Sequence, residues 1–333
     1  MQADAAHPER GSFVRDQVSA LRSIDGLDVE LYEFPPGAPQ LVRAALSARR
    51  RPAVAGRSTA GAPRGALRSG FDVVHAHFGL SAWPALAVGA RVRALTVHGT
   101  DVRHPRTRLA TAAVLPLIDI VAAASRELAR ELPCRSARRR AQVLPCGVDV
   151  ERFRPLARAE ARAELGLDGE RPYLLFPADP GRREKRHDRA QALAEACNAE
   201  LLTLGGVDPG RVPLWVNASN AVVVPSEREG FGLAALEGLA CDVPVLATPV
   251  GIHPEALAGV SGCLCAPFEL DRWRTALAAH LDSGGEREIA DDRASAGGSA
   301  RPSERRERAL AFSAQAMARR VAAAWRAALQ RSG

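Results

Sequence analysis

Two glutamates bracket the expected start of a helix in the second half of the chain. Glu229 and Glu237 stand eight residues apart in PSEREGFGLAALEGLACDVPVLAT, and Gly230 and Gly232 lie between them. Glycine lets a backbone turn tightly and approach a ligand closely. The amides expected at the helix start belong to Phe231, Gly232 and Leu233. Unsatisfied amides and the helix dipole favour a bound phosphate at such a position.

On a regular helix Glu237 would lie about 10–12 Å from Glu229 along the axis. This separation suits a diphosphate that carries a sugar at one end and a ribose at the other. We expect Glu229 to accept hydrogen bonds from sugar hydroxyls and Glu237 from the ribose diol. The spacing alone also fits a solvated helix with two ordinary glutamates, but its place between VVVPS and LACDVPVLAT favours a binding site.

Lys185 is the only lysine of the chain; the other Lys+Arg residues, of 45 in total, are all arginines. It lies in DPGRREKRHDRA, after the apolar run Tyr173–Ala178 and before a predicted helix. A lysine ammonium is a compact charge on a flexible stem, whereas the arginine head is a planar fork, so the two do not exchange freely beside a phosphate. Chance survival of one lysine is the alternative.

Several histidines stand on or just after predicted strands. His98 lies in TVHGTD, three residues before Asp101, and His75 and His77 alternate within FDVVHAHFG. Alternate residues of a strand share a face, so the last two could ligate a metal. A metal-dependent hydrolase built on these four residues is therefore one alternative.

Continuous apolar runs separated by helical segments predict the α/β fold class. In the second half YLLFPA, AELLTLGG, NAVVVPS and VPVLAT are expected strands, and in the first half LDVELYEF, FDVVHAHFG, ALTVHGTD and IDIVAAAS. Such runs are typical of parallel sheets buried on both faces. We predict two doubly wound domains, 1–165 and 166–305, and a C-terminal helix over 306–330.

The first domain is expected to lack its first strand. A doubly wound domain begins with a central strand before its first glycine loop, yet only MQADAA precedes HPERGS. These six residues cannot supply a buried strand rich in β-branched or aromatic residues. We therefore expect an incomplete N-terminal sheet and loop-like residues 1–10: either the true start lies upstream, or the first domain has a gap at its centre.

The charge distribution narrows the choice of partners. The net charge is +7, and the segment from Phe34 to Phe71 holds seven arginines and no acid. Aromatic residues make up 5% of the chain and no nucleic-acid-binding motif occurs, so nucleic acid is excluded as a partner. An anionic membrane surface or a phosphorylated substrate suits the arginines better, and a solvated arginine face is the alternative.

Other sequence features indicate a cytoplasmic protein. The six cysteines are expected to be reduced, since Cys263 and Cys265 form a poor zinc spacing. No uninterrupted apolar run of membrane length and no secretory signal occur in the sequence. We expect the cytoplasm, with a peripheral contact at the inner face of the membrane.

Taken together, the motifs resemble glycosyltransferase family 4, whose members are retaining enzymes with the GT-B fold of two facing Rossmann-like domains. GSFVRDQVSAL resembles the family's first loop and helix, with Gly11 at the glycine-rich loop. LTVHGTDV resembles its T-x-H-G-x-D segment, and VLPCGVDVERFRP resembles its N-G-V-D-x-x-x-F motif with Cys146 in place of Asn. The last helix resembles the crossover helix that packs back on the first domain.

The resemblance implies roles for individual residues. Arg182 and Lys185 would hold the diphosphate of the donor, although their spacing of three is shorter than in many relatives. His98 would face the donor sugar and, with Arg182, Lys185 and Glu229, would form the catalytic set. The residues implied on the acceptor side of the first domain are Gly11, His77 and Asp101.

The resemblance also implies the reaction. A hexose would pass from a nucleoside diphosphate sugar to a hydroxyl of a glycan or lipid-linked acceptor, in cell-surface polysaccharide or glycolipid synthesis and without a metal or other cofactor. A nucleotide-sugar epimerase of the same fold is an alternative, but it needs catalytic carboxylates in the first domain, and the E-x7-E and T-x-H-G-x-D motifs argue against it. A non-catalytic, sugar-nucleotide-binding relative is the other alternative.

Overall fold

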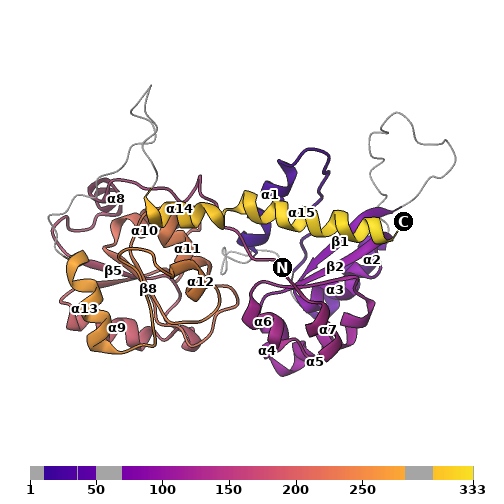
Figure 1. The fold of residues 1–333 in the computed structure, drawn as a ribbon, viewed down its shortest axis with the longest axis horizontal. Helices are drawn as coiled ribbons and strands as arrows, with labels where there is room; N and C mark the ends of the chain where they lie inside the picture. Colours follow the sequence, from indigo (N-terminus) through magenta and orange to yellow (C-terminus); the bar gives the residue numbers. More distant parts are fainter. Residues whose placement is uncertain (1–10, 36, 50–69, 282–302, 333) are drawn as a thin grey trace. The chain divides into compact units, whose positions relative to one another are not determined.

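The computed structural model describes residues 11–35, 37–49, 70–281 and 303–332. They form two compact units, each built on a parallel sheet flanked by helices (Figure 1). The first unit contains Phe13–Cys146 and the end of the chain from Met317, and the second contains Gly147–Ala316. The α/β fold class with two doubly wound units is as predicted.

The division between the units lies after Cys146, so residues 147–165, expected in the first domain, belong to the second unit. Helix α8 (Arg158–Leu165) packs against α10 (Val212–Ala218). Arg162 is 2% exposed, and its guanidinium donates to the carbonyl of Ala218 (3.0 Å) and to Oδ1 of Asn220 (2.8 Å). These buried hydrogen bonds attach α8 to the second unit.

The first unit has a four-stranded parallel sheet in the order β1-β2-β3-β4 among the described residues. Its strands are β1 (Phe71–His77), β2 (Ala90–Val97), β3 (Ile120–Ala123) and β4 (Gln142–Val143). Its helices are α1 (Ser12–Arg22), α2 (Ala38–Arg49), α3 (Gly79–Ala85), α4 (Thr100–Arg103), α5 (Pro105–Val114), the 3-10 turn η1 (Leu115–Leu117), α6 (Arg126–Glu131) and α7 (Arg135–Arg140).

The predicted strand LDVELYEF is wrong. Residues 27–34 have no strand assignment, and β1 is an edge strand among the described residues. A strand exists only where a neighbouring strand takes up its backbone hydrogen bonds. The central strand that would pair with this segment in a doubly wound sheet is not among the described residues. The expectation for residues 1–10 lies outside the described residues.

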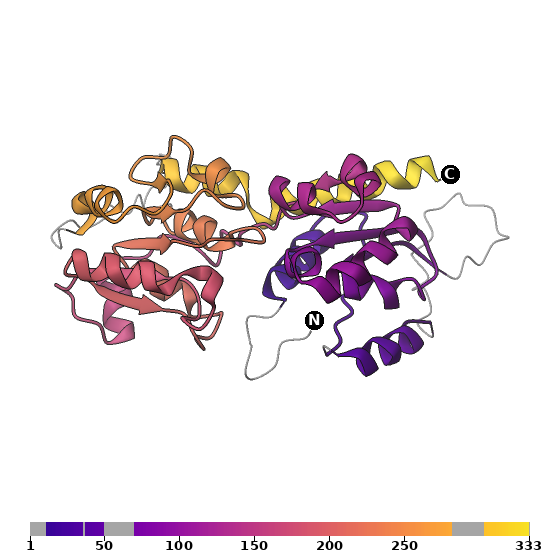
Figure 2. The ribbon, with the colours of Figure 1, turned by 90° about the horizontal axis from the view of Figure 1, so that it is seen from below.

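The C-terminal segment, expected as one helix, forms two. α14 (Glu304–Ala311) belongs to the second unit, and α15 (Ala314–Arg331) belongs to the first from Met317 onward. The helix breaks where the backbone pairs with Val148, whose amide donates to Phe312 O (3.0 Å) and whose carbonyl accepts from Ala314 N (2.8 Å). Figures 1 and 2 show α15 lying along the first unit. Its apolar face packs on the sheet through Trp325, Ala328 and Leu329 against Val73, Val92, Ala94 and Ile120.

The second unit has a five-stranded parallel sheet in the order β6-β5-β7-β8-β9. Its strands are β5 (Tyr173–Phe176), β6 (Glu200–Thr203), β7 (Ala221–Val224), β8 (Val245–Ala247) and β9 (Leu264–Cys265). Its remaining helices are η2 (Arg183–Lys185), α9 (His187–Ala196), α11 (Leu233–Ala240), α12 (His253–Leu257) and α13 (Leu270–Leu281). β5 and β7 are neighbours in the sheet but not in the sequence, so the loops that follow them meet at one edge.

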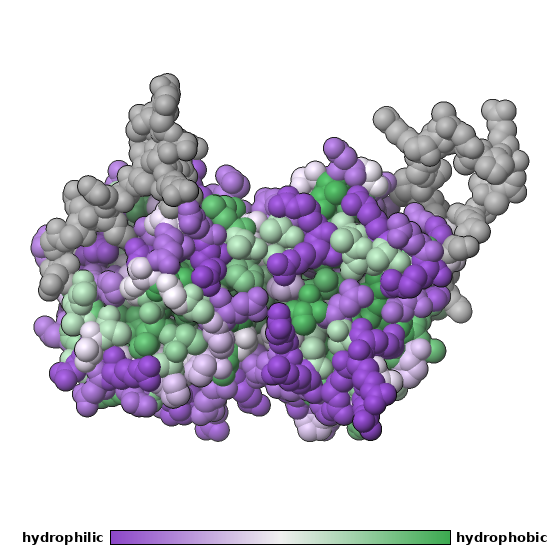
Figure 3. All heavy atoms as spheres, viewed as in Figure 1, coloured by the Kyte–Doolittle hydropathy of each residue, from purple (hydrophilic) through white to green (hydrophobic). Residues whose placement is uncertain are grey.

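The sheet of the second unit is buried under apolar side chains. The central strands β5, β7 and β8 are fully buried, as their continuous apolar sequence predicts. Trp273 and Leu277 of α13 pack with Leu193 of α9 against Phe176 and Val223. On the face drawn in Figure 3, polar and apolar residues are interspersed. Within the described residues, no helix is both long enough and apolar enough to cross a membrane.

Candidate active site

The loops after β5 and β7 in the second unit bring the predicted donor-site residues together. The first loop runs through η2 to Arg186, which adopts a left-handed conformation (φ 58°) just before α9. The second runs from Pro225 to Gly232, just before α11. The amide of Glu227 donates to the carbonyl of Glu184 (2.9 Å), so the two loops are joined through their backbones.

Lys185 and Glu229 form an ion pair at the centre of this arrangement. The lysine Nζ lies 2.7 Å from Oε1 and 2.6 Å from Oε2 of Glu229, whose Oε1 also accepts from the hydroxyl of Ser226 (2.7 Å). The side chains are 16% and 7% exposed. Burial favours a raised pKa for Glu229, but the Lys185 charge, His253 and the two side-chain hydrogen bonds outweigh it and lower that pKa below its ordinary value. The carboxylate is therefore ionised and holds an ammonium group in place.

The start of α11 is shaped by two glycines in left-handed conformations. Gly232 (φ 101°) precedes Leu233, and a Cβ on Gly232 would lie 2.5 Å from Nε2 of His253. A Cβ on Gly251 (φ 61°) would meet the carbonyl of Phe231. Only glycine fits at either position. The amide of Ala235 donates to the carbonyl of Gly232 (3.3 Å), and the amides at the start of a helix in general favour an anion.

His253 is a buried part of this site that the sequence reasoning missed. It is 0% exposed, and its Nδ1 lies 2.9 Å from the carbonyl of Thr248. A carbonyl only accepts, so Nδ1 carries the proton, and Nε2 faces Gly232. Ser226 and Glu227 were also missed. The available signal was position: Ser226 and Glu227 lie in the loop after the apolar strand β7, and His253 begins α12, the helix after the apolar strand β8.

The other predicted donor residues are placed less centrally. Arg182 is exposed, and its guanidinium pairs with Glu184 (3.1 and 2.9 Å) rather than with the central pair. Glu237 lies on α11, one turn beyond its start, and is half-buried. Gly230 and Phe231 form the turn that leads into the helix, where Phe231 is 6% exposed.

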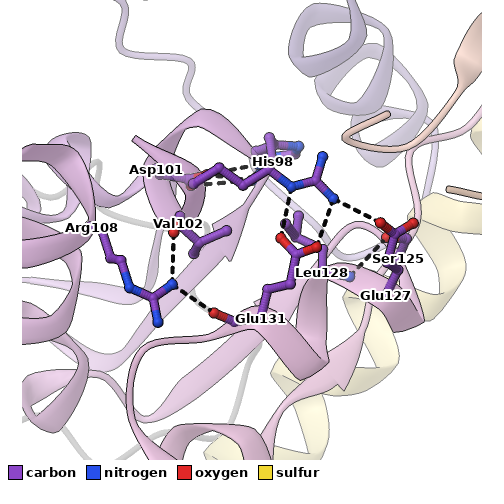
Figure 4. Close-up of polar contacts among 10 residues, drawn as sticks. His98, Asp101, Val102, Arg108, Ser125, Glu127, Leu128 and Glu131 are labelled. Atoms are coloured by element: carbon purple, nitrogen blue, oxygen red, sulfur yellow. Dashed lines mark hydrogen bonds and ion pairs between the residues drawn. The ribbon is translucent and has the colours of Figure 1, made fainter. Parts of the chain in front are cut away.

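In the first unit, Asp101 anchors the loop that carries His98. Its carboxylate accepts from the amide of His98 (3.1 Å; Figure 4). It also accepts from the amides of Gly99 (2.8 Å) and Gly79 (3.3 Å). Burial raises the pKa of Asp101 against the lowering effect of these amides. The carboxylate therefore holds the loop by its backbone. In the same close-up, Glu131 and Glu127 bind the guanidinium of Arg103 at 2.7 and 3.0 Å, which joins α4 to α6.

The histidines of the first unit form a stack. His77 Nδ1 lies 3.0 Å from His98 Nε2, and the His75 and His77 rings stack at 4.8 Å. The rings of Phe13 and Phe78 lie 4.7 and 4.8 Å from that of His98. Burial lowers the pKa of His75 to about 4 and, with the nearby His75, that of His98 to about 3. Burial and the neighbouring histidines also lower the pKa of His77. The three rings are neutral at physiological pH.

The alternative of a metal-dependent hydrolase needs a set of metal ligands, which the described residues do not form. Among residues 11–35, 37–49, 70–281 and 303–332, no group of three or more His, Cys, Asp or Glu side chains is arranged to hold a metal ion. Asp101, one of the four suggested ligands, is directed at backbone amides instead.

Gly11, also expected on the acceptor side, takes a left-handed conformation (φ 71°) just before α1.

Comparison with known proteins identifies the family. The protein-family model "Glycosyltransferase Family 4" matches residues 12–152 of this chain. The protein-family model "Glycosyl transferases group 1" matches residues 160–296. A D-inositol 3-phosphate glycosyltransferase of Frankia alni is 31% identical over 63% of this chain and 68% of its own length. The D-inositol 3-phosphate glycosyltransferase 1 of Catenulispora acidiphila is 30% identical over 78% and 73%. This chain belongs to glycosyltransferase family 4.

The solved structures agree with the fold. The Anabaena Alr3699/HepE structure in complex with UDP-glucose matches with a TM-score of 0.64 at 14% identity, covering 98% of both chains. The chain described here therefore has the GT-B fold, as its motifs predicted.

Proposed function

We propose that this glycosyltransferase moves a hexose from a nucleoside diphosphate sugar to an acceptor hydroxyl with retention of the anomeric configuration, in cell-envelope polysaccharide or glycolipid synthesis. The observation that carries the proposal is the Lys185–Glu229 ion pair beside the open start of α11. It offers a fixed cation and helix amides to a diphosphate, and a carboxylate to the neighbouring sugar hydroxyls. The Anabaena structures with UDP and with UDP-glucose support a nucleotide sugar as donor.

In the proposed reaction the departing diphosphate carries the developing charge. Lys185, with Arg182, and the amides at the start of α11 stabilise that charge, which is the main electrostatic demand of the reaction. The acceptor hydroxyl attacks on the face that the diphosphate leaves, and a phosphate oxygen takes the proton. No side chain is needed as a nucleophile, and no metal or cofactor takes part.

The acceptor is proposed as a hydroxyl of a glycan or a lipid-linked sugar. The names of the similar family members also make an inositol phosphate a compound to test. The first unit, with Gly11, Asp101 and the neutral His77, is proposed to supply the acceptor side, and its neutral His98 is proposed to face the donor sugar.

A peripheral contact with an anionic membrane is proposed as a second property of the first unit. Helix α2 exposes Val42 (61%) and Leu46 (56%) one turn apart, with the exposed Arg43 beside them. Apolar side chains with adjacent arginines suit an anionic lipid surface. Sedimentation with vesicles of phosphatidylglycerol, and not with phosphatidylcholine, would support the contact. Equal sedimentation with the two, or none, would contradict it.

The donor assignment is tested by binding and turnover. UDP, ADP and GDP are titrated by calorimetry, and their glucose conjugates are assayed for release of the diphosphate with each acceptor class. We expect one diphosphate to bind and Lys185→Met to weaken that binding, with the exposed Arg228→Gln of the adjacent loop as a matched control. Absence of binding for all three diphosphates, or equal binding in Lys185→Met, would overturn the proposal.

A further inference from the structure

A second, more exposed ion pair joins the same two loops. Arg186 NH1 lies 2.5 Å from Glu227 Oε1, and the side chains are 29% and 50% exposed. The same guanidinium binds both carboxylate oxygens of Asp188, at 2.8 and 2.6 Å. Arg189 NH2 also faces Glu227, at 3.8 Å. The pair therefore lies beside the backbone hydrogen bond between Glu227 and Glu184.

The Arg186–Glu227 pair (the outer pair) lies next to the Lys185–Glu229 pair (the inner pair) in both loops. Arg186 follows Lys185 directly, and Glu227 stands two residues before Glu229. The two ion pairs thus link the loops at neighbouring positions, the inner one buried and the outer one facing solvent. Any movement of one loop away from the other would break both.

The backbone at Arg186 makes its side-chain contacts important. Arg186 has φ 58° and ψ 55°, a left-handed conformation that an L-residue other than glycine adopts at a cost. The contacts with Asp188 and Glu227 stabilise this conformation. Because the turn at Arg186 connects η2 to α9, it also sets the direction in which Lys185 leaves the loop.

We propose that Arg186 and Glu227 are positioning residues for donor binding. They hold the loop after β5 against the loop after β7, so that Lys185 Nζ is already at Glu229 when the diphosphate of the donor arrives. The inference rests on the proposed function of Lys185. Neither residue touches the donor in this proposal, and their effect passes through Lys185 because a preordered cation loses less freedom on binding.

The expected effect is small but specific. An exposed ion pair contributes little, so Glu227→Gln should weaken diphosphate binding about 2- to 5-fold and raise the donor KM by the same factor, with kcat nearly kept. Glu227→Gln retains the backbone amide that donates to Glu184, so the backbone link between the two loops is kept. Arg228→Gln removes a charge from the same loop at an exposed position between the two glutamates and should leave binding unchanged.

The decisive experiment repeats Glu227→Gln in a Lys185→Met background. Calorimetry measures the affinity for whichever of UDP, ADP and GDP binds the unmodified chain. The proteins are the unmodified chain, the two single variants, the double variant and Arg228→Gln. If the pair acts by placing Lys185, Glu227→Gln has no further effect once Lys185 is gone. An equal fold-loss in both backgrounds, or equal affinities for Glu227→Gln and Arg228→Gln, would overturn the inference. Unchanged binding in Lys185→Met alone would instead overturn the proposed function.

A second cycle covers the case in which Lys185→Met folds poorly or binds too weakly to measure. Arg186→Gln and Glu227→Gln are combined in the otherwise unmodified chain. A positioning pair predicts that the double variant binds the diphosphate no more weakly than the weaker single variant. Losses that multiply in the double variant would show that the two residues act independently and would contradict the proposal.

Discussion

Lys185→Met should convert Glu229 from a stabilising group into a destabilising one. Methionine keeps an unbranched apolar stem but removes the charge that lies 2.6 Å from the Glu229 carboxylate. Glu229 is 6% exposed, so the remaining carboxylate would be buried without its cation. Removing one partner of a buried ion pair typically costs about 3–5 kcal/mol of the free energy of unfolding. For a domain of this size, each kcal/mol lowers Tm by about 2–4 °C, so we expect a fall of about 6–20 °C.

The loss should depend on pH in a definite direction. In the unmodified protein the pKa of Glu229 is lowered, so its ionised form stabilises the fold above its ordinary pKa, and this contribution disappears as pH falls through the lowered value. In Lys185→Met burial dominates and raises the pKa above its unfolded value. The variant should then be least stable, relative to the unmodified chain, near pH 8. The difference should shrink as pH falls through the raised pKa and Glu229 takes up a proton.

Thermal unfolding at pH 5 and pH 8, followed by circular dichroism, measures both effects. Glu229→Gln combined with Lys185→Met should recover most of the lost Tm, because no buried charge remains. Arg228→Met, which removes an exposed cation from the adjacent loop, should change Tm little at either pH. A loss that is the same at both pH values and is not recovered in the double variant would refute this account of the pair.

Four further outcomes follow from the structure. Lys185→Arg should fold normally but lose about 10- to 100-fold in kcat/KM, since the planar head displaces the diphosphate; activity near that of the unmodified chain would make the single lysine an accident of composition. Glu237→Gln should weaken binding of the free diphosphate, whereas Glu229→Gln should weaken mainly the sugar-bearing donor, and equal losses in calorimetry would contradict this division. The lowered pKa of His75, about 4, predicts that its contribution to stability is complete above its unfolded pKa and is lost as pH falls toward 4; His75→Gln should show a shallower fall of Tm over that range. Transfer should persist in excess EDTA, and a loss restored by zinc would contradict the metal-free proposal.

The sequence predicted most of what depends on local pattern. The continuous apolar runs gave the four main strands of the second unit, and the glycines before α11 marked its start correctly. Helix α9 (His187–Ala196) also lies where the sequence predicted a helix. By contrast, residues 27–34 alternate well enough to form a strand, but pairing decides whether a strand forms, and that depends on a distant segment.

In the donor site, too, the sequence predicted the residue types but not the contacts that depend on distant segments. The identities of Lys185 and Glu229 could be chosen from the sequence, but their direct ion pair could not, because they are 44 residues apart and meet only through the adjacency of β5 and β7. Arg182 was expected beside Lys185, yet its nearest carboxylate is Glu184, two residues away. His253 carried no recognisable motif, and its place becomes evident only when β8 is set beside β7.

The structure indicates which ring nitrogens of His75 and His98 carry a proton, which the sequence motifs cannot show. The indole of Trp325 can only donate, so at 3.2 Å it makes Nδ1 of His75 an acceptor and leaves Nε2 to donate to Thr96 Oγ1. Burial raises the pKa of Cys146 to about 12, so its thiol stays protonated and can donate to Nδ1 of His98.

The order of protons in the stack then follows. In one consistent order Nδ1 of His98 accepts from Cys146, so that its Nε2 donates to Nδ1 of His77, 3.0 Å away. His77 is left with its proton on Nε2. The family's Asn is replaced here by Cys146, which stands at the end of this chain of hydrogen bonds. The substitution therefore falls at the residue that contacts Nδ1 of His98, where a thiol can still donate.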